Sequence, residues 1–268
     1  DLIQDLNFSY DGKNQVLHDV SLKIRKGEML AIVGRNGAGK STLCKLICGF
    51  EKTDSGRIFF NGEDITGATI RKRAGFIGYV MQNPNQMISQ PMIYDEVVMG
   101  IKNSGLDEEE MKERVYETLK ICGLYEFRNW PVSALSFGQK KRVTIASILV
   151  MGPKVIILDE PTAGQDLKHY TEIMEFLREL NSQGITIIVV THDMHLMLEY
   201  TDRSIVFTEG RMLADESGSA VLCDPGLVEK AALKETSLFN LANMCSIEDP
   251  VAFTDCFIAC EKMVRAHE

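Results

Sequence analysis

The sequence predicts an α/β fold in which a largely parallel sheet follows an antiparallel β part, is interrupted by a helical insertion and precedes a small helical extension. Two observations predict it. Short, almost purely apolar runs at 29–33, 155–158 and 185–190 have the length of strands buried on both faces. Helical spacing of apolar residues separates these runs. The 268 residues suffice for one large domain, or for a domain with an appendage.

The first part of the chain is predicted to form antiparallel strands. Apolar and polar residues alternate on both sides of a turn signal, Asp11-Gly12, as in strands with one buried face. The alternating residues are Leu6, Phe8 and Tyr10 before the turn and Val20, Leu22 and Ile24 after it.

Three later segments have helical spacing. The first follows the run 29–33 and a glycine-rich turn. The second, at about 94–150, is predicted to be a helical insertion in which Asp107 and Glu110 form an N-cap pair. The third lies between the last two apolar runs. Their core-facing residues are Leu43, Ile47 and Phe50; Met111, Val115, Leu119 and Cys122; and Ile173, Phe176, Leu177 and Leu180.

The C-terminal part is predicted to contain two short helices and no strand. Asp224-Pro225 and Asp249-Pro250 each place a capping side chain before a proline suited to a first helical turn. The second helix carries an apolar stripe, which either packs against the main domain or forms a second dimer contact. The stripe is Phe253, Phe257, Cys260 and Val264. We therefore expect a main domain at 1–215 and a small helical extension at 216–268.

Composition excludes several classes of protein. With 29 Lys and Arg against 38 Asp and Glu, the net charge is −9, which argues against nucleic acid as a partner. No apolar run approaches the ~20 residues that span a bilayer. The seven cysteines form no C-x-x-C pair, so we expect free thiols in a reducing compartment. The chain begins at Asp1 rather than Met, which suggests a trimmed start or a piece of a longer polypeptide.

Residues 34–41 read Gly-Arg-Asn-Gly-Ala-Gly-Lys-Ser and fit the pattern G-x-x-x-x-G-K-[ST] between a predicted strand and a predicted helix. Glycines let backbone N–H groups turn toward phosphate oxygens, and the start of the helix adds partial positive charge. Lys40 would reach the β- and γ-phosphates, and the Ser41 hydroxyl would coordinate Mg²⁺. The motif predicts a P-loop NTPase core.

Two further motifs narrow the chemistry. The run 155–158 ends in Asp159 and Glu160, placed to hold Mg²⁺ and to orient or deprotonate a water. Ser136 and Gln139 form an S-x-x-Q capping box, so a helix begins here and its first turn can receive an anion.

Taken together, seven elements in order resemble the motifs of the ATP-binding cassette (ABC) transporter family, over residues 1 to about 210. Gln82 resembles the glutamine of the Q-loop, His192 the switch histidine, residues 135–139 the signature and 163–166 the D-loop. The resemblance implies ATP and Mg²⁺ as cofactors. The implied ATP-contacting residues are Tyr10, Gly34, Asn36, Gly37, Ala38, Gly39, Lys40, Ser41, Thr42, Ser136, Gly138 and Gln139. The implied Mg²⁺ ligands are Ser41, Gln82 and Asp159, and the implied catalytic residues are Glu160, His192 and Gln82.

Two positions depart from the family's usual pattern. Phe137 stands in the signature where Gly is most common, and Gln165 stands in the D-loop where Leu is usual. Within the family, the signature and residues 162–166 look most like the ATPases of energy-coupling factor (ECF) importers.

The resemblance also implies partners. The signature of one cassette faces the γ-phosphate held by another, so a homodimer or heterodimer of cassettes is expected, bound to separate transmembrane subunits at the cytoplasmic face of the membrane. Methionines near Gln82 either fill a core or receive a helix from that membrane partner. They are Met81, Met87, Met92 and Met99. We expect His195 and the basic runs 71–73 and 140–142 to lie on solvated surfaces.

Other functions compete with import. A soluble cassette ATPase in DNA maintenance would carry a long coiled coil between phosphate loop and signature, and a translation factor would carry two cassettes and a basic linker. One half of a tandem two-cassette protein is also an alternative. An idle regulatory cassette is disfavoured because Lys40, Asp159, Glu160 and His192 are all present.

Overall fold

The computed structural model describes residues 2–163, 167–234 and 236–265. Two sheets form its centre, one with the strand order β2-β1-β4-β5 and one with the order β10-β9-β3-β8-β7-β6. The first sheet contains β1 (Leu2–Ser9), β2 (Gln15–Lys23), β4 (Ser55–Phe60) and β5 (Glu63–Asp64). The second contains β3 (Met29–Val33), β6 (Ile77–Val80), β7 (Val155–Asp159), β8 (Thr186–Thr191), β9 (Arg203–Thr208) and β10 (Arg211–Glu216).

The pairing of the strands confirms the predicted mixed architecture. In the first sheet β1 pairs antiparallel with β2 and β4, as the alternation predicted. In the second, β3 is parallel to β8 and β9, and β7 is parallel to β6 and β8, so the three apolar runs share one parallel sheet. Only β10 runs antiparallel to its neighbour β9.

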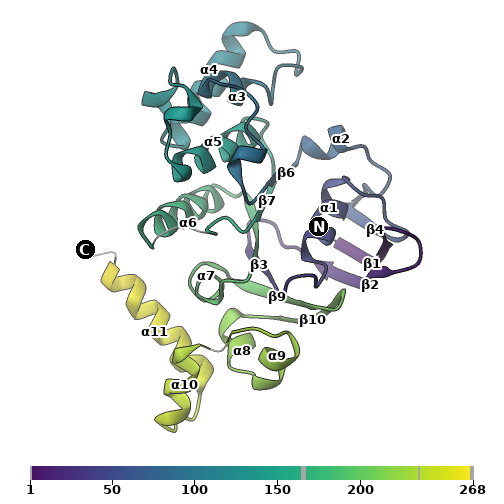
Figure 1. Cartoon of the computed structure of the whole chain (residues 1–268), viewed down its shortest axis with the longest axis vertical. Helices are drawn as coiled ribbons and strands as arrows, with labels where there is room; N and C mark the ends of the chain where they lie inside the picture. The colour runs from purple at the N-terminus through teal and green to yellow at the C-terminus, as the bar shows by residue number, and fades with distance from the viewer. Residues whose placement is uncertain (1, 164–166, 235, 266–268) are drawn as a thin grey trace.

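Helices cover the sheets and extend to either side of them (Figure 1). The helices are α1 (Lys40–Cys48), α2 (Ile70–Ala74), α3 (Ile93–Val98), α4 (Glu108–Ile121), α5 (Phe137–Leu149), α6 (Leu167–Ser182), α7 (Met194–Tyr200), α8 (Gly218–Leu222), α9 (Pro225–Lys230), α10 (Ser237–Met244) and α11 (Pro250–Arg265). Single 3-10 turns are η1 (Pro84–Gln86), η2 (Tyr125–Phe127) and η3 (Val132–Ala134). None of the helices in the described ranges has both the length and the apolar character needed to cross a membrane.

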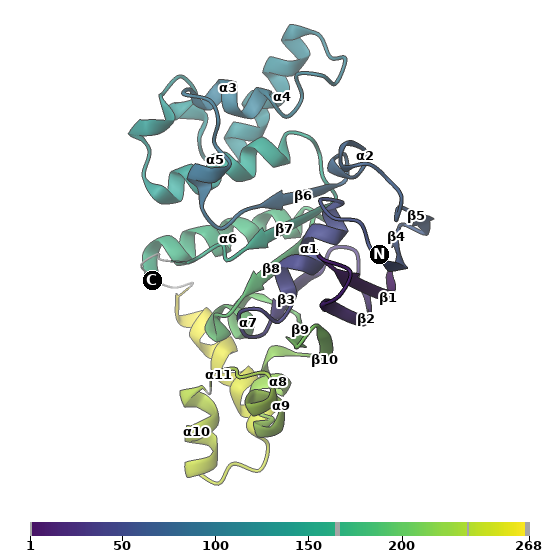
Figure 2. The same cartoon turned by 45° about the vertical axis from the view of Figure 1, so that its right-hand side comes forward.

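The faces of the parallel sheet border different cores. Leu30 and Ile32 of β3 pack with β1, β2 and α1, whereas Ile156 and Leu158 of β7 pack with α4, α5 and α6. The predicted insertion is confirmed as the body formed by α3, α4 and α5, which both views place at one end of the molecule (Figure 2). The capping box predicted from Asp107 is present at the start of α4.

The C-terminal part differs from the expectation of two short helices. It contains the four helices α8 to α11, and α11 has 16 residues. Within the predicted stripe Phe253 is half-buried, whereas the most buried residues of α11 are Thr254 and Ile258. Phe257 and Val264 are 43% and 60% exposed. Neither of these two side chains lies in a core, and the second dimer contact and the division at residue 216 stay predictions.

The basic runs are solvated only in part: Arg71 and Lys72 are exposed as expected, whereas one residue of each run is buried. Arg73 and Lys141 are 3% and 0% exposed, and each donates hydrogen bonds to backbone carbonyl groups, which compensates the burial of its charge. Nη1 of Arg73 donates to the carbonyl oxygens of Leu46 at 2.6 Å and Ile47 at 2.9 Å. Nη2 donates to Ile65 and Thr66, at 2.7 and 2.8 Å. The guanidinium therefore satisfies carbonyls at the end of α1, the helix that follows the phosphate loop.

We expect Arg73→Met to lower the free energy of unfolding by about 2–4 kcal/mol, because buried carbonyl groups lose charged donors. Urea denaturation measures the change. Arg71→Met, at an exposed position of the same helix, is the control and should change stability by less than about 0.5 kcal/mol. Equal stability of the two variants would contradict the anchoring role of Arg73.

Candidate functional site

The phosphate loop connects the end of β3 to the start of α1. Gly34, Gly37 and Gly39 have φ values of 145°, 81° and 102°, a backbone region that favours glycine. Nζ of Lys40 donates to the carbonyl oxygens of Gly34 at 2.6 Å and Arg35 at 3.0 Å. Burial lowers the pKa of Lys40, while the nearby carboxylates of Glu160 and Asp159 act against this shift. The loop thus presents an ammonium group beside the amino-terminal end of a helix, the arrangement that binds phosphate.

Asp159 lies at the end of β7, beside this loop. Its Oδ2 accepts hydrogen bonds from the hydroxyl of Tyr79, at 2.9 Å, and from that of Ser41, at 3.3 Å. Burial and the Asp159 charge raise the pKa of Tyr79, so the phenol stays a donor. Tyr79 was not predicted from the sequence, where its only signal is its place in the strand that precedes Gln82.

The oxygens of Ser41 and Asp159 suit Mg²⁺, which prefers hydroxyl and carboxylate ligands and keeps sites for phosphate and water. No group of three or more His, Cys, Asp or Glu side chains that could hold a metal occurs in the part of the chain that the structure describes. A cation at Ser41 and Asp159 would therefore share its shell with phosphate oxygens.

Glu160 and His192 meet at the ends of β7 and β8. Nδ1 of His192 lies 2.6 Å from Oε1 of Glu160, and the hydroxyl of Thr191 donates to the other carboxylate oxygen at 3.4 Å. The backbone of Glu160 has φ of 45°, and its N–H donates to the carbonyl of Val190. A left-handed backbone at a residue with a long side chain is uncommon and clusters at functional sites.

Glu160 and His192 also line a cavity of about 760 Å³, together with residues of the C-terminal part such as Lys234 and Thr236. His195 lies on α7 and its Nε2 is 3.1 Å from the buried carboxylate of Glu199. That hydrogen bond raises the pKa of His195. His195 is thus tied to a buried group rather than being only a surface residue.

The helix start at residue 136 forms as predicted. The Ser136 hydroxyl accepts from the N–H of Gln139 at 3.3 Å, and the Gln139 side chain accepts from the N–H of Ser136 at 3.0 Å. Ser136, Gly138 and Gln139 line a cavity of about 490 Å³ with His169. They belong to the helical body, and the views place the start of α5 away from α1 (Figure 2). The structure does not bring them together with the phosphate loop of the same chain.

Other predicted residues take varied positions. Tyr10 is 55% exposed, and its hydroxyl lies 3.2 Å from that of Thr42 on α1. Asn36 and Gln82 are exposed, whereas Ala38 is buried. Residues 164–166 of the predicted D-loop lie outside the described residues.

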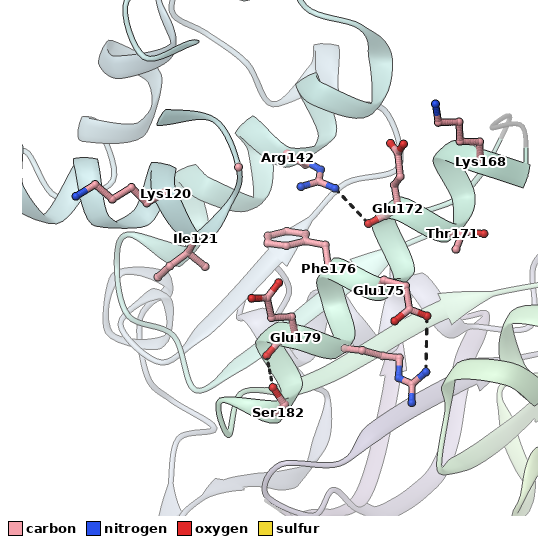
Figure 3. A pocket seen from close by; sticks show the side chains of 12 residues that line it. Lys120, Ile121, Arg142, Lys168, Thr171, Glu172, Glu175, Phe176, Glu179 and Ser182 are labelled. Carbon is pink, nitrogen blue, oxygen red and sulfur yellow. Dashed lines mark hydrogen bonds and ion pairs between the residues drawn. The ribbon is translucent and has the colours of Figure 1, made fainter. Parts of the chain in front are cut away.

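A larger cavity, of about 1310 Å³, is lined by residues of the helical body and of α6 (Figure 3). The Arg142 guanidinium lies over the Phe176 ring, 5.1 Å from its centroid, and Nη2 donates to the carbonyl of Glu172. Lysines, arginines and glutamates alternate around the cavity, and neither the phosphate loop nor Glu160 lines it. Its size therefore does not mark the reactive site.

Comparisons with known proteins agree with this geometry. A family model described as "ABC transporter" matches residues 17–163. A relative from Clostridium perfringens, provisionally named an ABC transporter ATP-binding protein, is 60% identical over 262 residues, covering 98% of this chain and 46% of the relative. A relative from Enterococcus faecalis with the same provisional description is 57% identical and is covered to the same 46%. The chain spans about half the length of the curated relatives that it matches.

Solved structures show the same fold. The structure of cbiO1 from Clostridium perfringens, described as part of the ABC transporter complex cbiONQ, aligns with a TM-score of 0.79 at 38% identity and covers 92% of this chain and 98% of that one. An ATP-binding cassette solved as a dimer in a post-hydrolysis state with ADP and Pi aligns with a TM-score of 0.71 at 30% identity, covering 81% and 97% of the two chains.

We expect Gly34→Ala to destabilise the protein by roughly 3 kcal/mol or more, because a Cβ there would lie 2.1 Å from the carbonyl oxygen of Phe207. Gly37→Ala is the matched control. Its Cβ would have no neighbour within 4 Å, so only the cost of the left-handed backbone, ~1 kcal/mol, should remain. Thermal unfolding of both variants distinguishes the two costs, and equal losses would contradict the close approach of β9 to the loop.

Proposed function

Because this chain belongs to the ABC transporter family of ATP-binding proteins, we propose that it binds ATP with Mg²⁺ and hydrolyses it to power import through separate transmembrane subunits. The family hydrolyses ATP, and the chain is an ABC ATPase domain. The observation that carries the proposal is the 2.6 Å contact between His192 and Glu160, one residue beyond the Asp159–Ser41 pair. Proton-accepting and phosphate-binding groups thus meet at one edge of the sheet.

In this proposal Tyr10 stacks on the adenine, and the loop residues hold the phosphates. The loop set is Gly34, Asn36, Gly37, Ala38, Gly39, Lys40, Ser41 and Thr42. Lys40 would turn from the loop carbonyls to the β- and γ-phosphates. Ser41, Asp159 and Gln82 would hold Mg²⁺, which neutralises charge on the transferred phosphoryl group when bound.

Glu160 is proposed to orient the attacking water and accept its proton as the oxygen–phosphorus bond to ADP breaks and inorganic phosphate forms. His192 holds the carboxylate of Glu160 in place and would contact the γ-phosphoryl oxygens. Contacts of both carboxylate oxygens, to His192 and Thr191, hold the Glu160 side chain, so the base does not have to be ordered during the reaction.

A dimer follows from the separation of the two phosphate-binding elements. Ser136, Gly138 and Gln139 lie in the helical body, away from the loop of their own chain, so their hydrogen-bond donors would serve the ATP of a second cassette. The dimeric cassette with ADP and Pi supports this proposal. Such a sandwich closes while the γ-phosphate is present and opens after hydrolysis, which converts binding into movement.

The proposed import is of the ECF type and takes place at the cytoplasmic face of the membrane. The likeness to cbiO1, described as part of an ABC transporter complex, supports transporter partners. The methionines near Gln82 support a membrane partner in part. Met87 packs against the core, which accounts for it, but Met81 and Met99 are 38% and 48% exposed. Flexible, exposed apolar side chains suit a surface that receives a helix.

A second candidate is one half of a longer polypeptide with two cassettes. The relatives favour it, because this chain covers only 46% of each of the two described above. An antibody against the cassette tests it, since a native band well above 30.0 kDa supports a longer polypeptide and a band at that mass rejects it.

We expect Glu160→Gln to reduce ATP turnover by about 10²- to 10⁴-fold, because the amide cannot accept the proton of water. ATP-dependent dimerisation should persist or strengthen, as measured by light scattering with and without ATP. Glu229→Gln, at an exposed position of α9, is the control and should keep parental turnover. Unchanged turnover in Glu160→Gln would reject the role of Glu160.

The double variant Met81→Ser with Met99→Ser should weaken co-purification with membrane subunits while ATP binding is retained. Loss of apolar contact area is the physical reason. Met244→Ser, which changes an 85% exposed methionine on α10, is the matched control. Co-purification that resists the double change would place the docking surface elsewhere.

A further inference from the structure

Lys141 is a fully buried cation with defined partners. It lies on α5, two residues past Gln139, and is 0% exposed. Its Nζ donates to the carbonyl oxygens of Met81 at 2.8 Å and of Gln82 at 2.7 Å. Lysine is almost never fully buried without partners, because an ammonium group loses its hydration there. An apolar residue would fill this position without that cost, so packing alone does not explain a lysine.

The two carbonyls belong to the segment that leaves the sheet for the helical body. β6 ends at Val80, which pairs with Leu158 of β7, directly before Asp159. Met81 and Gln82 therefore start from the reactive edge of the sheet, and η1 and α3 follow them. Lys141 fixes the backbone of Gln82 from the helical side.

Arg142, the next residue of α5, extends the connection within that side. Its Nη1 donates to the carbonyl of Cys122 at the end of α4, and its Nη2 donates to the carbonyl of Glu172 on α6, both at 3.3 Å. Helix α5 is thus capped by Ser136, contacts Gln82 through Lys141, and contacts α4 and α6 through Arg142. A displacement of its capped start would be transmitted to Gln82 along one rigid helix.

We propose that Lys141 is a positioning residue that sets Gln82 according to the position of the signature helix, so that engagement of Ser136 by one nucleotide controls Gln82 at the other. The inference rests on the proposed function, in which Ser136 serves the partner's ATP and Gln82 serves the chain's own. Hydrogen bonds between a charged donor and carbonyl groups are directional enough to carry such a movement. The coupling element is one side chain spanning two segments about 60 residues apart in sequence.

The test compares Lys141→Met with Lys140→Met in the full chain. Methionine keeps the length of the stem but has no donor, and Lys140 is a half-buried neighbour on the same helix. We expect Lys141→Met to lower kcat by about 10- to 100-fold through misplacement of Gln82, with little change in the affinity of the isolated chain for ATP. The thermal midpoint should fall, because the carbonyl groups of Met81 and Gln82 lose their charged donor, so kcat is measured at a temperature at which the variant is folded. Lys140→Met should leave kcat unchanged.

A double-mutant cycle with Gln82→Ala separates positioning from a structural role. If Lys141 acts through Gln82, Lys141→Met should cost no further kcat in the Gln82→Ala background. Equal losses in both backgrounds, or parental kcat in Lys141→Met, would overturn the proposal. If Lys141→Met does not fold at the assay temperature, Lys141→Gln takes its place in the cycle.

The two proposals fail in different ways. If the proposed function is wrong, Glu160→Gln should keep full turnover. If only the inference about Lys141 is wrong, Glu160→Gln should still be inactive, whereas Lys141→Met should either stay active or lose kcat in addition to the loss caused by Gln82→Ala.

Discussion

The parallel register of β3, β7 and β8 is the constraint on which the site depends. Val33 of β3 pairs with Thr191 of β8, and Asp159 of β7 pairs with Val190 of β8. The carboxyl ends of the three strands therefore finish at nearly the same level. The residues that follow each strand lie at its carboxyl end, and these ends share one edge of the sheet. That edge therefore carries the phosphate loop, the acidic pair and His192. A shift of one residue in this register would separate Glu160 from His192.

This edge could be predicted from the sequence because each of its elements is local. Apolar runs of strand length are followed at once by the residues that carry chemistry, so the order of strand, loop and helix places them. The capping box at Ser136 and Gln139 is local in the same sense, and the structure contains it. Tyr79 escaped prediction because its contact with Asp159 crosses two strands that are far apart in sequence.

Burial of a residue by segments that are distant in sequence could not be predicted. Arg73 and Lys141 stand in runs of basic residues, which suggests solvent, yet the fold closes over both of them. Their partners are backbone carbonyl groups, and these leave no signature in the identity of side chains. What covers the stripe on α11 could not be predicted for a related reason. Helical spacing identifies an apolar face, but it does not say whether that face is covered within the same chain.

The two buried cations have a common physical role at different distances from the reaction. Each satisfies carbonyl oxygens where a regular element ends, Arg73 after α1 and Lys141 after β6. A helix end or a strand exit held by several charged hydrogen bonds moves with the body that supplies the charge. Arg73 comes from α2, which contacts α1 and β6, so it fixes the phosphate-loop helix to the core. Lys141 comes from the helical body, so it attaches the segment that follows β6 to the body that carries Ser136. The same kind of hydrogen bond therefore holds two parts of the site differently. The phosphate-loop helix stays with the sheet, whereas Gln82 moves with the helical body.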